Sequence, residues 1–116
     1  MKTELFEFQV RVHPTREHPC FNEIEFGKLI IFIYGTNRED ALIKASKIAC
    51  LLPYRIGAAK IFPVAEQEKL DSYQVACIEK AKTIGVRCAL FHWPKGTDEK
   101  TVLHSWPYLV PPMDEH

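Results

Sequence analysis

Residues 28–34, with the sequence KLIIFIY, constrain the fold of this chain more than any other segment. A β-strand places successive side chains on opposite faces, so this run would be apolar on both of its faces. Such a strand needs cover above and below, which is typical of the inside of a sheet that carries helices. The run is also far too short to cross a bilayer as a helix.

Three other segments have strand patterns. In residues 5–12 the apolar side chains alternate with polar ones, which predicts a strand with one buried face (Phe6, Phe8, Val10 and Val12) and one face in water. We expect this strand to pair antiparallel with residues 28–34. Residues 55–64 and 86–93 are largely apolar, and we interpret both as inner strands. Gly57, Ala58 and Ala59 weaken this interpretation of the first segment, and the alternative is that they mark close helix packing.

Two amphipathic segments separate these strands. Residues 36–39 fit a capping box, with Asn37 as an equally good cap one position later, and they predict a helix that ends at about Leu52. Apolar residues at helical spacing predict a second helix from about Glu66 to Ile84. Gly85 is placed to end that helix in the left-handed conformation.

The predicted order is therefore strand, strand, helix, strand, helix, strand. Alternation of helices and strands favours parallel strands joined by right-handed crossovers. We expect one small α/β domain over residues 1–110, with a four-stranded mixed sheet whose inner strands are parallel, and a frayed tail over residues 111–116. A ferredoxin-like α+β sandwich is the alternative.

Charge and cysteine content narrow the range of partners. The 116 residues include fifteen Lys plus Arg and fifteen Asp plus Glu, so the net charge is zero. Nucleic-acid binding needs a local positive excess, whereas neutrality favours self-association. The N-terminus shows no signal peptide, and no apolar run is long enough to span a membrane. We therefore predict a cytoplasmic protein whose four cysteines are reduced.

The common catalytic and nucleotide-binding motifs are absent. The sequence contains no GxGxxG, GxxxxGK[ST], HExxH or GxSxG. Their absence argues against dinucleotide, P-loop, zincin and serine-hydrolase mechanisms, and we predict no cofactor. The sequence favours a protein that is not an enzyme, without excluding an unfamiliar small enzyme.

The predicted parallel strands place one candidate ligand site. In open α/β sheets, ligands bind outside the C-terminal ends of the strands. A helix N-terminus and several cations would meet there and would suit a small anionic ligand. The candidate residues are Thr36, Asn37, Arg38, His92, Trp93 and Lys95. The alternative is that the first residues cap a helix and the others end a strand.

The loop that follows the first strand contains candidate metal ligands. His13, His18 and Cys20 offer imidazole and thiolate ligands, but a fourth ligand would have to come from elsewhere in the chain. The alternative is a proline-rich loop exposed to solvent. We predict no metal site.

Three functions remain open on this evidence. The first is a non-catalytic binding or regulatory module, in which Trp106, Tyr108 and Leu109 would form a homodimer interface. The second is a small enzyme or ligand-binding domain for an anionic metabolite, with His92 as the proton-transfer group. The third is an interaction component of a bacterial or phage assembly.

Overall fold

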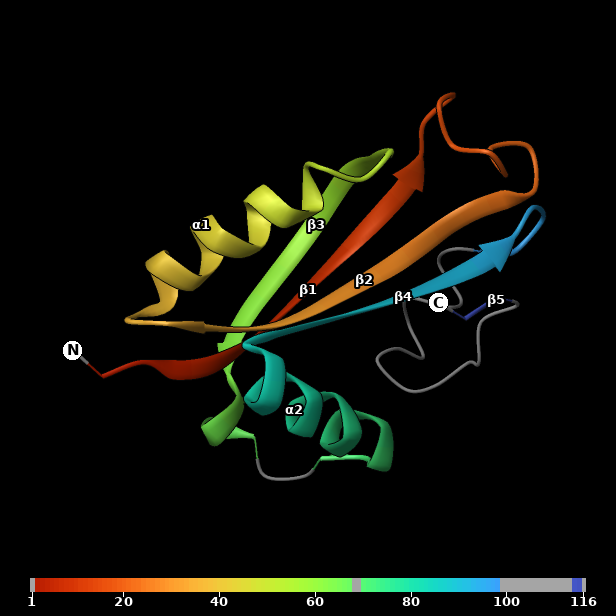
Figure 1. Ribbon diagram of the computed structural model, residues 1–116. Coiled ribbons are helices and arrows are strands. Elements are labelled where there is room, and N and C mark those ends of the chain that lie inside the picture. The colour runs from red at the N-terminus through yellow and green to blue at the C-terminus, as the bar shows by residue number, and fades with distance from the viewer. Residues whose placement is uncertain (1, 68–69, 99–113, 116) are drawn as a thin grey trace.

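The computed structural model describes residues 2–67, 70–98 and 114–115, which form a sheet with one helix on each side (Figure 1). The strands are β1 (Glu4–Pro14), β2 (Ile24–Gly35), β3 (Tyr54–Pro63), β4 (Val86–Pro94) and the short β5 (Asp114–Glu115). The helices are α1 (Arg38–Ala49), the single 3-10 turn η1 (Val64–Glu66) and α2 (Ser72–Ile84).

Every pair of neighbouring strands is antiparallel, so the prediction of parallel inner strands is wrong. The order across the sheet is β3-β1-β2-β4-β5. The predicted antiparallel pairing of β1 with β2 is confirmed, and β1 then lies between β2 and β3. β4 joins the other side of β2 and runs against it. The ferredoxin-like alternative does not fit either, because that fold has the order βαββαβ.

The two faces of the sheet carry separate apolar cores because side chains alternate along each strand. On the face covered by α1, the predicted buried side chains of β1 pack with those of β2 and with three alanines of the helix (Phe6, Phe8, Val10, Val12, Leu29, Ile31, Ile33, Ala41, Ala45 and Ala49). On the other face, α2 packs on β2 and β4 through Ile30, Phe32, Cys77, Ile78, Ala81 and Ala89. We call these the α1 face and the α2 face.

The caps explain where each helix begins and ends. Asn37 caps α1, since its Oδ1 accepts from the backbone N–H of Asp40 at 2.8 Å. α2 begins at Ser72 rather than at Glu66, because Asp71 and Gln74 form a capping box there. The predicted role of Gly85 is confirmed, as it ends α2 with φ +101°.

We expected the polar face of β1 to lie in water, and at Glu7 this prediction is wrong. Glu7 is fully buried, although its side chain lies on the face opposite to that of its neighbours Phe6 and Phe8.

Of the predicted frayed tail, residues 111–113 and 116 lie outside the described part, while Asp114 and Glu115 pair with His92 and Phe91 of β4. The four cysteines form no disulfide.

Candidate functional site

Two histidines and a tyrosine meet at the end of the sheet where β1 and β4 finish. The Nε2 atom of His18 lies 2.8 Å from the hydroxyl of Tyr54, and that hydroxyl lies 2.5 Å from Nε2 of His92. His92 is only 2% exposed, Tyr54 is buried and His18 is half-buried. We call these three residues the histidine–tyrosine cluster, and it leads from the surface into the protein.

The backbone places these side chains on the α1 face from three separate elements. His18 comes from the loop between β1 and β2, Tyr54 begins β3, and His92 is near the end of β4. The residue that pairs with His92 on β2 is Gly27, where an added Cβ would lie 3.1 Å from the imidazole and 2.8 Å from a backbone carbonyl oxygen. A glycine is therefore required beside His92 to leave room for its ring.

The loop that carries His18 is held at both ends. The backbone N–H and the hydroxyl of Thr15 both donate to the carbonyl of Pro53, at 3.0 and 3.1 Å. At the other end, the N–H of Lys95 donates to the carbonyl of Glu23 at 3.0 Å. These bonds join the loop to the residue before β3 and to the residue after β4, so the cluster lies between fixed points.

The hydrogen bonds of the cluster have one consistent direction. The backbone N–H of Cys20 donates to Nδ1 of His18 at 2.9 Å, so the proton of a neutral His18 ring is on Nε2. That Nε2–H donates to the hydroxyl of Tyr54, whose own proton then donates to Nε2 of His92. His92 consequently carries its ring proton on Nδ1. The arrangement is a directed chain of three hydrogen bonds.

This direction does not suit a metal ion. A histidine that binds a metal through one nitrogen normally donates from the other, whereas Nδ1 of His18 accepts. Within the described ranges, no group of three His, Cys, Asp or Glu side chains is placed to hold a metal. The loop residues His18 and Cys20 are instead joined by the hydrogen bond from the Cys20 backbone.

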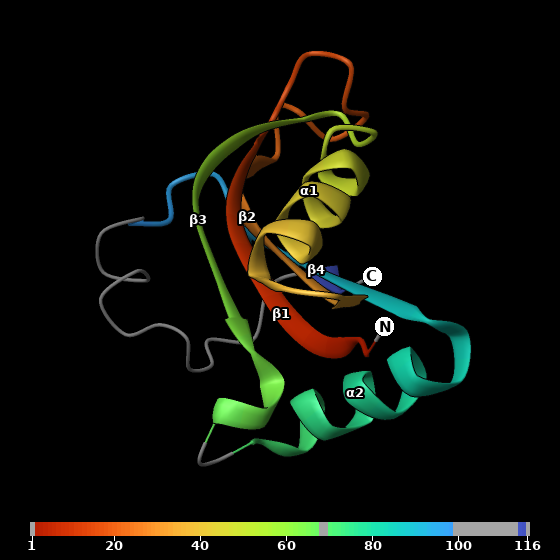
Figure 2. The same cartoon turned by 90° about the vertical axis from the view of Figure 1, so that its left-hand side faces the viewer.

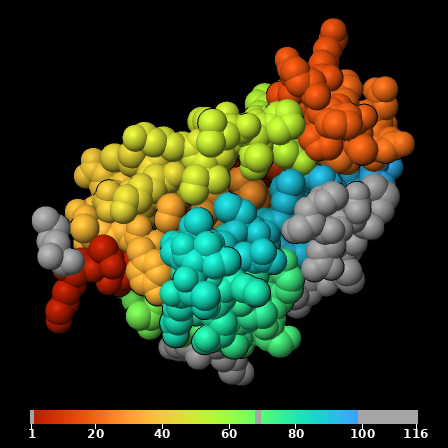
Figure 3. All heavy atoms as spheres, in the orientation of Figure 1, coloured from red at the N-terminus to blue at the C-terminus, as the bar shows by residue number. Residues whose placement is uncertain are grey.

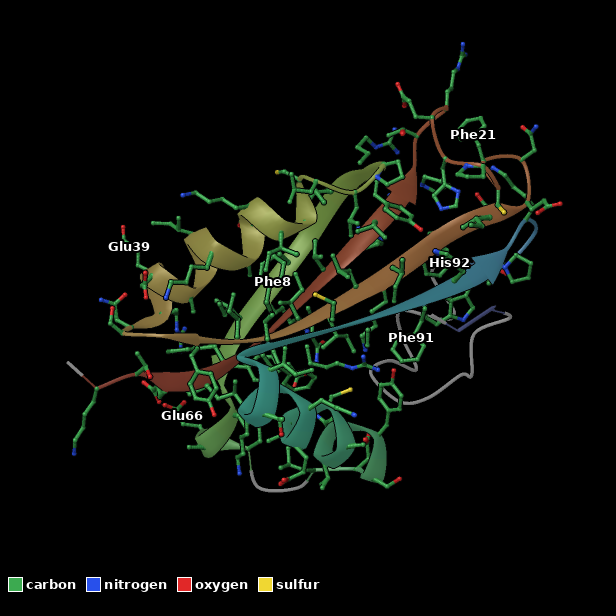
Figure 4. The ribbon with its side chains drawn as sticks, in the orientation of Figure 1. Phe8, Phe21, Glu39, Glu66, Phe91 and His92 are labelled. Atoms are coloured by element: carbon green, nitrogen blue, oxygen red, sulfur yellow. The ribbon has the colours of Figure 1, made fainter. Side chains whose placement is uncertain are left out.

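The predicted anion-site residues lie at opposite ends of the sheet, so they do not form one crevice. In Figure 4, Glu39 in the first turn of α1 and His92 mark these two ends. The crevice required β2 and β4 to run in the same direction, and they are antiparallel. A role for either group alone in ligand binding stays a prediction.

Apart from Arg38, these residues have local contacts in the structure. Asn37 caps α1, while the N–H of Thr36 donates to Asp40 and Arg38 is exposed. At the other end, Trp93 stacks on Phe26 with ring centroids 4.9 Å apart. The ammonium of Lys95 lies 5.9 Å from the ring centroid of Phe21. The predicted interface residues Trp106, Tyr108 and Leu109 lie outside the described residues.

A second feature, which the sequence prediction missed, is the outer edge of the sheet. β3 is the edge strand, and in the ranges that the structure describes no segment pairs with its outer side (Figure 2). Six consecutive residues of β3, from Arg55 to Lys60, are exposed. The prediction of an inner strand here, which follows from the largely apolar composition of the segment, is wrong. Its small residues Gly57, Ala58 and Ala59 were the signal against that interpretation.

A polar group lies on the α2 face beside this edge. Both carboxylate oxygens of Glu7 accept hydrogen bonds from amide side chains, one from Gln9 and the other from Gln67 and Gln74. Lys28 is buried on the same face. Burial lowers the pKa of Lys28 to about 7, the charges of Glu7 and Asp71 oppose this shift, and Lys60 adds to it.

Comparison with known proteins adds no family to this description. Neither the protein-family models, nor the curated proteins, nor the solved structures gave a match to this chain. In the described part of the chain, no helix has the length and apolar character needed to cross a membrane.

Proposed function

We propose that this chain is a cytoplasmic, non-catalytic binding module that adds an extended segment of a partner protein to the outer edge of β3. The observation that carries the proposal is the run of six exposed residues, Arg55–Lys60, on an edge strand. An edge strand presents backbone N–H and C=O groups that can pair with another strand. Peptide recognition by strand addition uses such groups for affinity and the neighbouring side chains for specificity.

The surroundings of β3 favour contact with another polypeptide. Gly57, Ala58 and Ala59 have small side chains, so a second backbone can approach this part of the strand closely. At the end of β3 near α1, Leu51 is 84% exposed and Ile56 is 39% exposed. Figure 3 shows this junction (yellow-green) at the surface, beside the orange loop that carries His18. An added strand would cover part of this apolar surface.

The occupant we favour is an extended segment of another protein rather than a second copy of this chain. β3 contains two basic residues, Arg55 and Lys60, and no acidic one. Basic residues on an edge strand disfavour pairing with an identical strand, because like charges are brought together. Zero net charge favours self-association of the whole chain, so a dimer is kept as an outcome of the test.

A catalytic role for the histidine–tyrosine cluster has less support. His92 was the group expected to transfer a proton to a substrate, but it is 2% exposed and hydrogen-bonded to Tyr54. A general acid or base must come within hydrogen-bond reach of its substrate. Because the ring is buried, the cluster is better suited to holding the loop against the sheet.

The proposed cytoplasmic location is supported by the four cysteines, which form no disulfide, as is usual in a reducing compartment.

Solution NMR tests the proposal with a capped octapeptide of alternating threonine and valine as the probe. We expect amide resonances of residues 55–60 to shift saturably and their hydrogen exchange to slow. The matched variant is Ala58→Pro, because Ala58 has no partner in the register with β1 and a bulge position tolerates proline. With unfolding curves showing that the variant is folded, its resonances in β3 should not respond.

Light scattering after size-exclusion chromatography separates the occupants. We expect the mass of a monomer, 13.4 kDa. A dimer that Ala58→Pro dissociates would show that a second copy of this chain occupies the edge of β3, and the proposal of a partner segment would be wrong. No saturable shift in residues 55–60 at millimolar peptide, for a protein that is monomeric, would overturn the proposal.

A further inference from the structure

Arg55 and Lys60 project from the same face of β3, although five positions separate them. In a regular strand, residues an odd number apart point to opposite faces. Here Arg55 is opposite His13 of β1, and Lys60 is opposite Gln9. His13 and Gln9 are four residues apart and therefore share one face of β1, and residues opposite each other across two strands share a face. Both cations thus lie on the α2 face.

An irregularity in β3 produces this arrangement. Ala59 is opposite Val10 and Ile56 is opposite Val12, so three steps along β3 match two steps along β1. This is the signature of a β-bulge, in which one strand holds an extra residue. The extra residue lies at Gly57–Ala58, and it returns Lys60 to the face of Arg55. From the five-residue spacing in the sequence alone, the two charges would be expected on opposite faces.

Two further nitrogen-bearing side chains of β1 lie on the α2 face near these cations. They are His13, which is opposite Arg55, and Arg11, which is opposite Lys28 of β2. On the described part of β1, the carboxylate of this face is that of Glu7, which is buried and accepts hydrogen bonds from glutamine amides. No ion pair within the described ranges involves Arg55 or Lys60, and both side chains are exposed.

We propose that the segment added to β3 carries two carboxylates four residues apart, one opposite Arg55 and one opposite Lys60. This inference rests on the proposed strand addition and specifies its partner. Residues four apart in a regular strand share one face and span about 13 Å. On the inner side of β3, the residues of β1 opposite the two cations are also four positions apart. A regular partner strand on the outer side would therefore have the same spacing. Opposite charges directly across two strands stabilise their pairing, whereas like charges oppose it.

Three capped octapeptides of threonine and valine test the inference. One carries glutamates at its second and sixth positions, one carries them at its second and fifth positions, and one carries lysines at its second and sixth positions. We expect the first peptide to bind about two- to fivefold more tightly than the second, because the second loses one of the two charge pairs. The lysine peptide should be the weakest. The differences should shrink in 0.5 M salt, because exposed charges are screened.

Charge reversal supplies the matched control. The double variant Arg55→Glu/Lys60→Glu should invert the order and prefer the lysine peptide. Lys2→Glu/Lys80→Glu makes the same change in net charge at exposed positions away from β3, and it should keep the original order. If all three peptides shift residues 55–60 with equal affinity, strand addition stands and the acidic pair is refuted. If none shifts them, both proposals are overturned.

Discussion

The hydroxyl of Tyr54 lies 2.5 Å from Nε2 of His92, and this contact joins the first residue of β3 to the end of β4. The two strands are separated in the sheet by β1 and β2. The contact therefore spans the α1 face at the end of the sheet where β3 begins and β4 finishes, after the last turn of α1. His18, in the loop between β1 and β2, completes the chain of hydrogen bonds through its contact with Tyr54.

Removing the hydroxyl of Tyr54 should destabilise the protein. Tyr54→Phe leaves the two imidazoles without the oxygen that joins them, and an unsatisfied buried polar group costs roughly 1–3 kcal/mol. Urea unfolding measures the change in the free energy of unfolding. Tyr34→Phe, at a half-buried tyrosine outside the cluster, is the control and should change it by less than about 0.5 kcal/mol. Equal stability of the two variants would argue against a structural role for the cluster.

The ring protons of the two histidines should be on different nitrogens. His18 accepts at Nδ1 from the backbone of Cys20, so we expect its neutral ring to be protonated on Nε2. His92 accepts at Nε2 from Tyr54, so we expect its proton on Nδ1. Nitrogen-15 chemical shifts of the imidazoles at pH 8 distinguish these tautomers. Finding both rings protonated on Nε2 would contradict the direction of the hydrogen-bond chain.

Lys28 should make the stability depend on alkaline pH. Its pKa is lowered to about 7 in the folded protein by burial, while the unfolded chain keeps the ordinary value of 10.5. Between these values the unfolded chain binds a proton that the folded protein lacks, so the free energy of unfolding rises with pH. The rise should reach at most about 5 kcal/mol and should level off above the unfolded pKa.

Replacing the ammonium group isolates this effect. Lys28→Met should lose the rise between pH 7 and about 10.5 and should be more stable than the wild type near pH 7, where the buried charge is most costly. Lys80→Met, at an exposed lysine of α2, should keep the wild-type slope. Parallel stability curves for the wild type and Lys28→Met would show that Lys28 titrates alike in the folded and unfolded states.

Glu7 should be sensitive to loss of its charge. Its oxygens accept from the amides of Gln9, Gln67 and Gln74, and Glu7→Gln would place an amide donor against other donors. We expect a loss of roughly 1–3 kcal/mol in the free energy of unfolding. Glu4→Gln makes the same chemical change at an exposed position of β1 and should cost almost nothing. A variant of Glu7 as stable as that of Glu4 would contradict the need for a carboxylate there.

Local patterns in the sequence were sufficient for features that depend on neighbouring residues. The alternation in residues 5–12 correctly identified the face of β1 that packs against α1, because side-chain direction repeats every second residue. Asn37 and Gly85 marked the start of α1 and the end of α2 through the backbone conformations that they favour. The order of helices and strands also follows from such patterns, since each element depends on a short window of the chain.

Strand direction and neighbours were decided by tertiary structure. Apolar periodicity is the same for a strand read in either direction, so nothing in residues 86–93 distinguished a parallel neighbour of β2 from an antiparallel one. β3 pairs with the outer side of β1 rather than with β2 or β4, and its apolar residues consequently lie at an edge. The cluster of His18, Tyr54 and His92 joins residues up to 74 positions apart, and the bulge that aligns Arg55 with Lys60 exists only against β1. Such relationships depend on which strands lie side by side, and spacing along one chain does not encode them.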